Sequence, residues 1–185
     1  MGVIDNSRKT LFPGISLAGF TNGSTKLYDY VSGNPKVYFA PYDYVNKVSN
    51  IASNDNFVSI NNALSIDLTG QVCAESIGFR QFSGSGGQVD YIRGAHLSKG
   101  GQSFIAMPSL AKTKDGVKSR ITVALEPGSV VTSLRAEIQY VVTEYGCVDL
   151  SYQDVPTRAK LLISIAHPDF RDELTAQAKQ YGLLY

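Results

Sequence analysis

Residues 84–107, GSGGQVDYIRGAHLSKGGQSFIAM, decide the fold of this chain. They open on a glycine-rich loop, continue as a predicted helix over residues 88–97, and end in the apolar run Phe104–Met107, which Pro108 stops. A helix that follows a loop and leads back into a buried strand is typical of layered α/β domains. The stretch therefore predicts an α/β fold in which this helix packs on a sheet.

The alternation of strands and helices extends in both directions along the chain. Runs of β-branched and aromatic residues between turn residues predict strands, and apolar residues at helical spacing predict helices. Pro156 and Pro168 stand where the first turn of a helix tolerates proline, Ser24 stands at a capping position, and Gly146 is expected to end a strand. Expected strands cover residues 37–40, 57–63, 65–68, 71–74, 119–125, 130–132 and 140–143, and expected helices cover 26–31, 44–51, 161–165 and 170–181. Because no repeat period is present, this order predicts one three-layer α/β domain over residues 1–185.

Composition argues against several classes of function. The 17 basic and 16 acidic residues give a net charge of +1, without the basic excess that binding to nucleic-acid phosphates normally requires. No apolar run approaches the roughly 20 residues of a membrane-spanning helix, so no membrane partner is expected. Cys73 and Cys147 stand far apart in a chain large enough to fold without a disulfide, which favours free thiols and a cytoplasmic location.

The beginning of the sequence is unusual for a natural start. Gly2–Lys9 is a polar connector that leads straight into the apolar stretch Ile15–Phe20. It has neither the apolar core of a signal peptide nor a complete myristoylation signal. We therefore expect no targeting segment here, and we expect a domain that is truncated on its N-terminal side.

The loop Gly84–Gly87 is the most informative local feature. Glycines have no β-carbon, so their backbone N–H groups can approach a phosphate or a developing oxyanion closely. The loop fits neither common nucleotide motif, because Gln88 stands where a Walker loop has lysine and Val89 stands where a dinucleotide motif has its third glycine. By local sequence alone, a plain connecting turn is an equally good interpretation.

Two other kinds of chemistry are disfavoured by residue spacing. His96, His167 and the two cysteines show no paired-ligand pattern, so no metal site is expected. His167 precedes Pro168 and is instead expected to cap a helix. Ser85 lacks the G-x-S-x-G frame of a nucleophilic serine, which makes serine-hydrolase chemistry a poor interpretation.

Seven segments, within a match that runs from about Val3 to the C-terminus, share their residues and their order with one enzyme family. They are VSIN (58–61), DLTGQVCAESIG (67–78), GGQVDYIRGA (86–95), SKGG (98–101), SRI (119–121), YVVTEYG (140–146) and IAHPDFR (165–171). On these residues the chain resembles the C-terminal domain of the 4-hydroxybutyrate CoA-transferase and acetyl-CoA hydrolase/transferase family. The resemblance implies a three-layer fold of the NagB/RpiA/CoA-transferase type with a mixed, largely parallel sheet.

The resemblance also implies covalent catalysis. Enzymes of this family attack an acyl-CoA thioester with a glutamate carboxylate, pass through a mixed anhydride and form a glutamyl-CoA thioester before CoA moves to the second acid. Their nucleophilic glutamate follows His-Ser or His-Thr, on a strand before the segment that matches Gly2–Ile4. Neither tripeptide occurs in this sequence, so the nucleophile is expected upstream of it and no catalytic residue is expected within it.

Five candidate site residues follow. The backbone around Gly86 and Gly87 matches the loop near the thioester carbonyl, where N–H donors would bind CoA and stabilise the oxyanion. Asn61 matches a position whose amide lies near the active site and CoA, and Glu144 and Gln88 are expected to line the pocket. By residue chemistry alone, a bond to local backbone is the favoured interpretation of Asn61, and a solvated carboxylate at a strand end is an equally good interpretation of Glu144.

The expected function is that of the C-terminal part of an acyl-CoA:carboxylate CoA-transferase for acids such as acetate, butyrate or 4-hydroxybutyrate. No permanent cofactor is expected, and the coenzyme A thioester is a substrate. The expected partners are acyl-CoA, a short-chain carboxylate, the N-terminal half of the same enzyme and further copies in a homo-oligomer. The alternative is a stand-alone CoA-binding module without catalysis.

Overall fold

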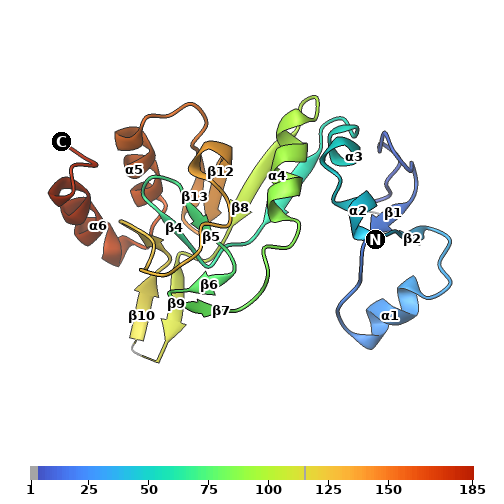
Figure 1. Cartoon of the computed structure of the whole chain (residues 1–185), viewed down its shortest axis with the longest axis horizontal. Coiled ribbons are helices and arrows are strands. Elements are labelled where there is room, and N and C mark those ends of the chain that lie inside the picture. The colour runs from blue at the N-terminus through green and yellow to red at the C-terminus, as the bar shows by residue number, and fades with distance from the viewer. Residues whose placement is uncertain (1–3, 115) are drawn as a thin grey trace.

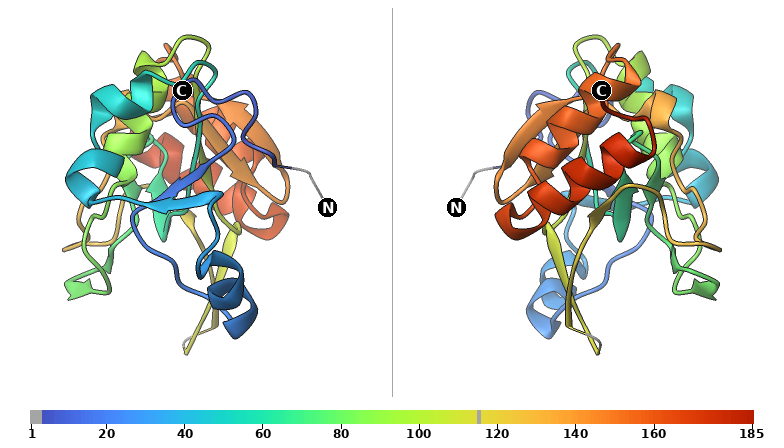
Figure 2. Two further views of the ribbon diagram at one scale, coloured as in Figure 1. Left: turned by 90° about the vertical axis from the view of Figure 1, so that its right-hand side faces the viewer. Right: turned by 90° about the vertical axis from the view of Figure 1, so that its left-hand side faces the viewer.

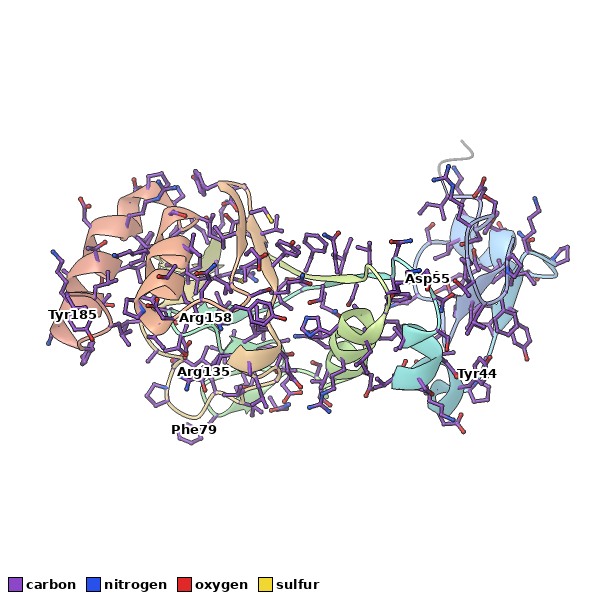
Figure 3. The ribbon with its side chains drawn as sticks, turned by 90° about the horizontal axis from the view of Figure 1, so that it is seen from above. Tyr44, Asp55, Phe79, Arg135, Arg158 and Tyr185 are labelled. Atoms are coloured by element: carbon purple, nitrogen blue, oxygen red, sulfur yellow. The ribbon has the colours of Figure 1, made fainter. Side chains whose placement is uncertain are left out.

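The computed structural model describes residues 4–114 and 116–185. The molecule is elongated, with the first strands at one end and the C-terminal helices at the other (Figure 1). Figure 3 shows the same shape from above, with Tyr185 at one end and Tyr44 towards the other. The candidate site lies towards the end that holds the first strands.

A four-stranded sheet forms the centre of the molecule. Its strand order is β13 (Gly146–Asp149), β12 (Tyr140–Thr143), β8 (Gln102–Ala106) and β3 (Val58–Asn61). The strands β3, β8 and β12 run parallel to one another, and β13 pairs antiparallel with β12. Parallel neighbours bring their carboxyl ends to one edge, which is where ligands bind in open α/β sheets.

One face of this sheet is buried under helices. Ile105 on β8 and Val141 on β12 are paired and almost fully buried, and they belong to the main hydrophobic core. Helix α4 (Gln88–Leu97) packs against β3 and β8, and α3 (Val48–Ala52) packs against α4. The two helices approach closely because residue 94 is glycine: a β-carbon there would stand 2.5 Å from Cβ of Ile51. Figure 2 shows these helices together on one side of the strands.

Smaller strand groups surround the central sheet. A three-stranded sheet orders β11 (Ile121–Thr122), β4 (Ser65–Asp67) and β5 (Val72–Cys73), with a parallel and an antiparallel pairing. Near the N-terminus, two strands pair in parallel, and two short antiparallel pairs lie at the surface. They are β1 (Ser16–Ala18) with β2 (Val37–Phe39), β6 (Ser76–Ile77) with β7 (Arg80–Gln81), and β9 (Leu110–Thr113) with β10 (Gly116–Ser119).

The remaining helices are α1 (Thr25–Val31), α2 (Tyr42–Val45), α5 (Val155–Ser164) and α6 (Pro168–Gln180), with a 3₁₀ turn at Arg135–Glu137. Helices α5 and α6 begin with capping side chains. Asp154 accepts a hydrogen bond from the Thr157 N–H, and His167 accepts one from the Asp169 N–H, which confirms the predicted capping role of His167. Both helices also carry their proline in the first turn, as predicted.

The predicted α/β class with a mixed, partly parallel sheet is confirmed. Several local predictions were wrong, including the strand expected over residues 119–125, of which β11 covers only Ile121–Thr122. The helix expected over residues 44–51 is two helices, because Lys47 takes an extended conformation between them. Residues 130–132 form no strand. The N–H groups of Thr132 and Ser133 donate to the Val72 carbonyl, and Ser133 accepts from the Val72 N–H, which makes an isolated bridge. Ser24 precedes α1 without making a side-chain capping bond.

Several further elements were not predicted, among them β1, β6, β7 and β13. Gly146 does not end the strand region but opens β13, because its φ of +149° lets the chain reverse within residues 144–145. The hairpin β9–β10 was also missed. Within residues 4–114 and 116–185, the helices are too short or too polar to cross a bilayer.

Candidate functional site

A hollow of about 640 Å³ lies between the N-terminal elements β1 and α2, the end of β3 and the start of α4. Four segments form its wall. They are residues 17–20 at the end of β1, residues of α2 and Asn46 after it, Asn61 at the end of β3, and residues 86–91 at the start of α4. The hollow therefore brings together four of the five candidate residues, Asn61, Gly86, Gly87 and Gln88.

The fold explains why these residues meet. Asn61 is the last residue of β3, so it lies at the carboxyl edge of the parallel strands. The chain returns from that edge through α4 before it enters β8, so the first turn of α4 lies at the same edge. The end of β3 and the start of α4 are separated by some 25 residues in the sequence, yet they form one wall of the hollow.

The glycine loop leaves helix donors free of side-chain caps. Gly87 is the N-cap residue of α4 and, being glycine, makes no side-chain capping bond, so the first N–H groups of the helix point outward without that partner. Gly86 has a φ of +57°, a conformation that favours glycine. Free N–H groups and the positive end of the helix dipole favour an anion or an oxyanion at this point.

The side chains of Asn61 and Gln88 are already engaged. Nδ2 of Asn61 donates to Oγ of Ser59 at 2.8 Å, so its local partner is a neighbouring side chain and not the backbone. Gln88 is buried, and its Nε2 donates to Oγ of Ser133 at 3.0 Å. The side-chain amide of Gln88 is thus committed to Ser133, although the residue lines the hollow.

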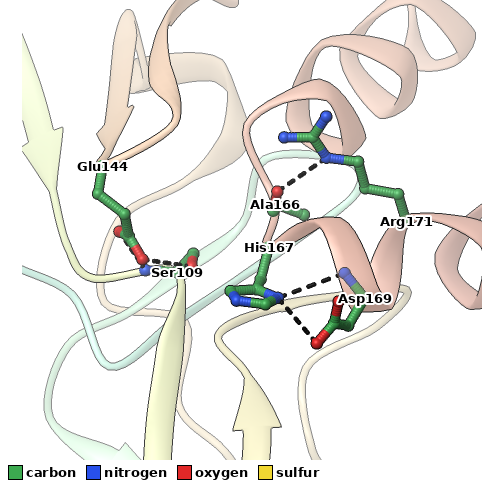
Figure 4. A network of polar contacts seen from close by, with 6 residues as sticks. All are labelled: Ser109, Glu144, Ala166, His167, Asp169 and Arg171. Carbon is green, nitrogen blue, oxygen red and sulfur yellow. Dashed lines mark hydrogen bonds and ion pairs between the residues drawn. The ribbon is translucent and has the colours of Figure 1, made fainter.

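Glu144 lies elsewhere, at the end of β12, and is not among the residues that line the hollow. Its carboxylate accepts hydrogen bonds from Ser109 N at 2.8 Å and from Ser109 Oγ at 2.6 Å (Figure 4). The Oγ bond is the main reason that the pKa of Glu144 is lowered, and His167 contributes a weaker electrostatic attraction. Ser109 is fully buried in the connection between β8 and β9, so the carboxylate of Glu144 is held against that connection.

Several residues of the hollow were not singled out by the sequence. Asn46 packs against Gly87, Phe20 and Tyr42 form a ring pair with centroids 6.3 Å apart, and Tyr91 stands one turn into α4. Burial, and secondarily the charge of Asp90, raises the pKa of Tyr91. Tyr91 falls inside the segment GGQVDYIRGA and so had a sequence signal, whereas Phe20, Tyr42 and Asn46 reach the hollow only through tertiary packing.

Over residues 4–114 and 116–185, the side chains of His, Cys, Asp and Glu form no cluster of three that could hold a metal ion. Both cysteines are free thiols, Cys73 buried and Cys147 exposed.

Comparisons with known proteins agree with the resemblance. The profile of the acetyl-CoA hydrolase/transferase C-terminal domain matches residues 23–178. The chain is 52% identical over 179 residues to the 4-hydroxybutyrate coenzyme A transferase of Clostridium kluyveri, covering 97% of this chain and 41% of that protein. It is 48% identical over 179 residues to the succinyl-CoA:cyclohexane-1-carboxylate CoA transferase of Geobacter metallireducens, covering 97% and 40%.

The fold agrees as well. The crystal structure of RipA from Yersinia pestis superposes with a TM-score of 0.90 at 46% identity, covering 99% of this chain and 41% of that one. The chain thus spans about two fifths of the length of the relatives that it matches. Since the family profile covers most of its residues, the chain belongs to the acetyl-CoA hydrolase/transferase C-terminal domain family.

Proposed function

We propose that residues 1–185 form a single C-terminal domain of an acyl-CoA:carboxylate CoA-transferase, of the kind that uses acetate, butyrate or 4-hydroxybutyrate. The observation that carries this proposal is the hollow in which Gly86, Gly87 and Asn61 share one wall. The volume of about 640 Å³ suits the thioester end of an acyl-CoA and a short acyl chain. The relatives named above carry CoA-transferase activity in their names.

The backbone of the glycine loop would supply electrostatic catalysis. When a nucleophile attacks a thioester carbonyl, negative charge develops on the carbonyl oxygen. N–H groups at the start of α4 can donate to that oxygen, because Gly87 places no side chain over them. A single oxyanion donor of this kind contributes about 3 kcal/mol to the transition state.

We propose that the nucleophile is a glutamate in the part of the protein that precedes this domain. Its carboxylate attacks the thioester carbonyl and expels CoA as a thiolate, which leaves a mixed anhydride. The thiolate then attacks the glutamyl carbonyl, releasing the first acid as a carboxylate and forming a glutamyl-CoA thioester. A second carboxylate repeats these steps in reverse and leaves as the new acyl-CoA. If water resolves the thioester instead, the same site hydrolyses acyl-CoA.

Glu144 is a poor candidate for that nucleophile. Its two carboxylate oxygens both accept hydrogen bonds from Ser109, which lowers the pKa of Glu144 and with it the nucleophilicity of the carboxylate. We therefore assign Glu144 a positioning role outside the hollow: at the end of β12 it holds the β8–β9 connection in place through Ser109.

The direct test compares this chain with a chimera. The chimera joins the N-terminal part of the C. kluyveri enzyme, up to the matched segment, to residues 4–185 of this chain. Each protein is mixed with acetyl-CoA and butyrate, and new butyryl-CoA is followed by chromatography. We expect turnover by the chimera and none by the chain alone. Turnover by the chain alone would contradict the upstream nucleophile, and an inactive, folded chimera would contradict the transferase assignment.

The alternative is a CoA-binding module without catalysis. The observation in its favour is that residues of this chain alone line the hollow. Calorimetric titration of the chain with CoA distinguishes the two. Binding by the chain alone, together with a chimera that binds CoA but never turns over, would establish the module. We further propose a homo-oligomeric, cytoplasmic protein with no permanently bound cofactor; free Cys73 and Cys147 fit a reducing compartment.

A further inference from the structure

The central sheet has a second face that carries apolar side chains. Strand residues alternate between faces, so the residues next to the buried Ser59, Ile105 and Val141 point the other way. Cross-strand register groups them into rows. One row runs Ile60, Phe104, Tyr140 and Asp149, and the next runs Ala106, Val142 and Cys147. We call the surface made by these residues and Val58 the open face.

The open face is exposed in this chain. Ile60 is 70% exposed, Val58 is 52% exposed, and Cys147 is exposed too. Phe104 and Tyr140 stack on each other with centroids 4.8 Å apart, yet each stays partly accessible. Its one charged residue in these rows, Asp149, stands on the edge strand β13. Contiguous apolar surface of this kind marks an interaction site, since isolated soluble domains rarely leave it uncovered.

Strand direction makes the exposure more unusual. Parallel strands are normally covered by helices on both faces, because the crossover connections place helices on each side. Here β3, β8 and β12 are parallel, and the helices α4 and α3 lie on the buried face (Figure 2). The open face is therefore exposed in this chain, although it has the apolar composition of a sheet face that is normally covered by helices.

Two observations identify what covers it. The relatives extend well beyond the matched segment, which makes up about 41% of their length, so more than half of each relative lies outside it. The first described residues also lead to this face: Ile4 and Val58 line one hollow of about 970 Å³. Ile4, the first described residue, therefore lies on the Val58 side of the open face.

We propose that the open face is the docking surface for the N-terminal half of the protein, which lays an amphipathic helix across β3, β8 and β12. This inference rests on the proposed partnership with that half. The contacting side of the helix must be apolar and uncharged over Ile60, Phe104 and Val142, with its polar side turned outward. Such a helix would complete the layer that the parallel strands require.

Cysteine alkylation tests the proposal in the chimera described above. In a Cys147→Ser background, Ile60→Cys places a thiol on the open face, and Leu97→Cys places one on α4. The two positions are matched, because each native side chain is 70% exposed. Rates of maleimide labelling are measured for both variants, in the chain alone and in the chimera.

We expect both thiols to react rapidly in the chain alone. In the chimera, labelling at residue 60 should slow by about tenfold or more, while labelling at residue 97 changes less than about twofold. Equal labelling of residue 60 in chain and chimera would overturn the proposal, as would equal protection at both positions. Protection of residue 60 in the chain alone, rising with concentration alongside a dimer mass, would assign the face to a second copy and overturn it too.

Labelling and turnover are independent readouts. A chimera that is protected at residue 60 but catalytically inactive would support the docking surface and contradict the proposed function. An active chimera that stays fully labelled at residue 60 would support the proposed function and contradict the docking surface.

Discussion

Asn46 packs its side-chain amide against Gly87 so closely that a β-carbon on residue 87 would stand 2.7 Å from Asn46 Nδ2. Both residues line the candidate hollow. Glycine at the N-cap of α4 therefore has two effects. It leaves the first N–H groups of the helix accessible, and it makes room for the amide of Asn46.

Gly87→Ala should reduce turnover by the chimera about tenfold, because the new methyl group displaces the Asn46 amide within the hollow. The backbone itself can accept alanine, since Gly87 has a φ of −92°. Stability of the chain should therefore change little. Kinetics of butyryl-CoA formation and urea unfolding measure the two effects.

Gly84→Ala is the matched control, because a β-carbon at residue 84 meets nothing within 4 Å and the residue does not need a positive φ. The double variant Gly87→Ala with Asn46→Ala should recover part of the lost activity by restoring space. If Gly84→Ala were as damaging as Gly87→Ala, contact with Asn46 would not be the cause.

Gly70→Ala should destabilise the chain by about 2–4 kcal/mol in urea unfolding. Gly70 has a φ of +96°, and its β-carbon would stand 2.7 Å from Nη2 of the buried Arg158. That same nitrogen donates to the Arg135 carbonyl at 2.6 Å, so it cannot withdraw freely. Gly33→Ala shares the positive φ but has open space, so it should cost only about 1–2 kcal/mol. Equal losses for both variants would show that the contact with Arg158 is unimportant.

Asp154→Ala should lower the urea midpoint, and Ser24→Ala should leave it unchanged. Asp154 accepts the Thr157 N–H at the start of α5, whereas Ser24 precedes α1 without a side-chain bond. A side-chain hydrogen bond from Thr157, and secondarily this N–H bond, lower the pKa of Asp154, so the stabilisation is present at neutral pH and is lost as the pH falls through that lowered value. The difference between wild type and Asp154→Ala should therefore shrink in acid, and a constant difference would argue against the cap.

Ser109→Ala should raise the pKa of Glu144 towards that of an ordinary glutamate, because the Oγ bond is the largest cause of its lowering. Carbon NMR of the carboxyl group follows this titration. His167→Ala should raise the pKa of Glu144 less, since the electrostatic attraction of His167 lowers that pKa less than the bonds from Ser109 do. A lowered folded-state pKa stabilises the native state above the ordinary value of about 4.3 and loses that effect as the pH falls. An unchanged pKa in Ser109→Ala would show that the bond does not hold in solution.

The sequence predicted those elements whose patterns are local and strong. Residues 88–97 form the predicted helix, and residues 140–143 form the predicted strand, because a glycine loop and a run of β-branched residues bound them. The sequence-based prediction failed where the backbone conformation of a single residue, or a partner distant in sequence, determines the structure. Lys47 separates one apolar periodicity into two helices. Residues 130–132, although β-branched, pair with no strand and bond instead to single groups such as the Val72 carbonyl and Ser76 Oγ.

For the candidate site, the resemblance gave five positions, four of which the fold brings together, but it could not give side-chain directions. Gln88 turns its amide inward because buried Ser133, 45 residues away, offers a hydroxyl. Glu144 turns towards Ser109 for the same kind of reason. Both choices depend on partners distant in sequence, which no local pattern encodes. Asn46 was missed because its role depends on Gly87 lying beside it.

The parallel order of the central sheet also sets how the chain can fold. Within the described sheet, β12 and β13 form the local pairing, since only residues 144–145 separate them, and hairpins of this kind form in about 1–10 μs. Joining β8 to β12 or to β3 requires closing loops of about forty residues before any ladder bond is gained. We therefore expect refolding to be slow relative to helical domains of equal length, with the β12–β13 hairpin formed early and β3 added late.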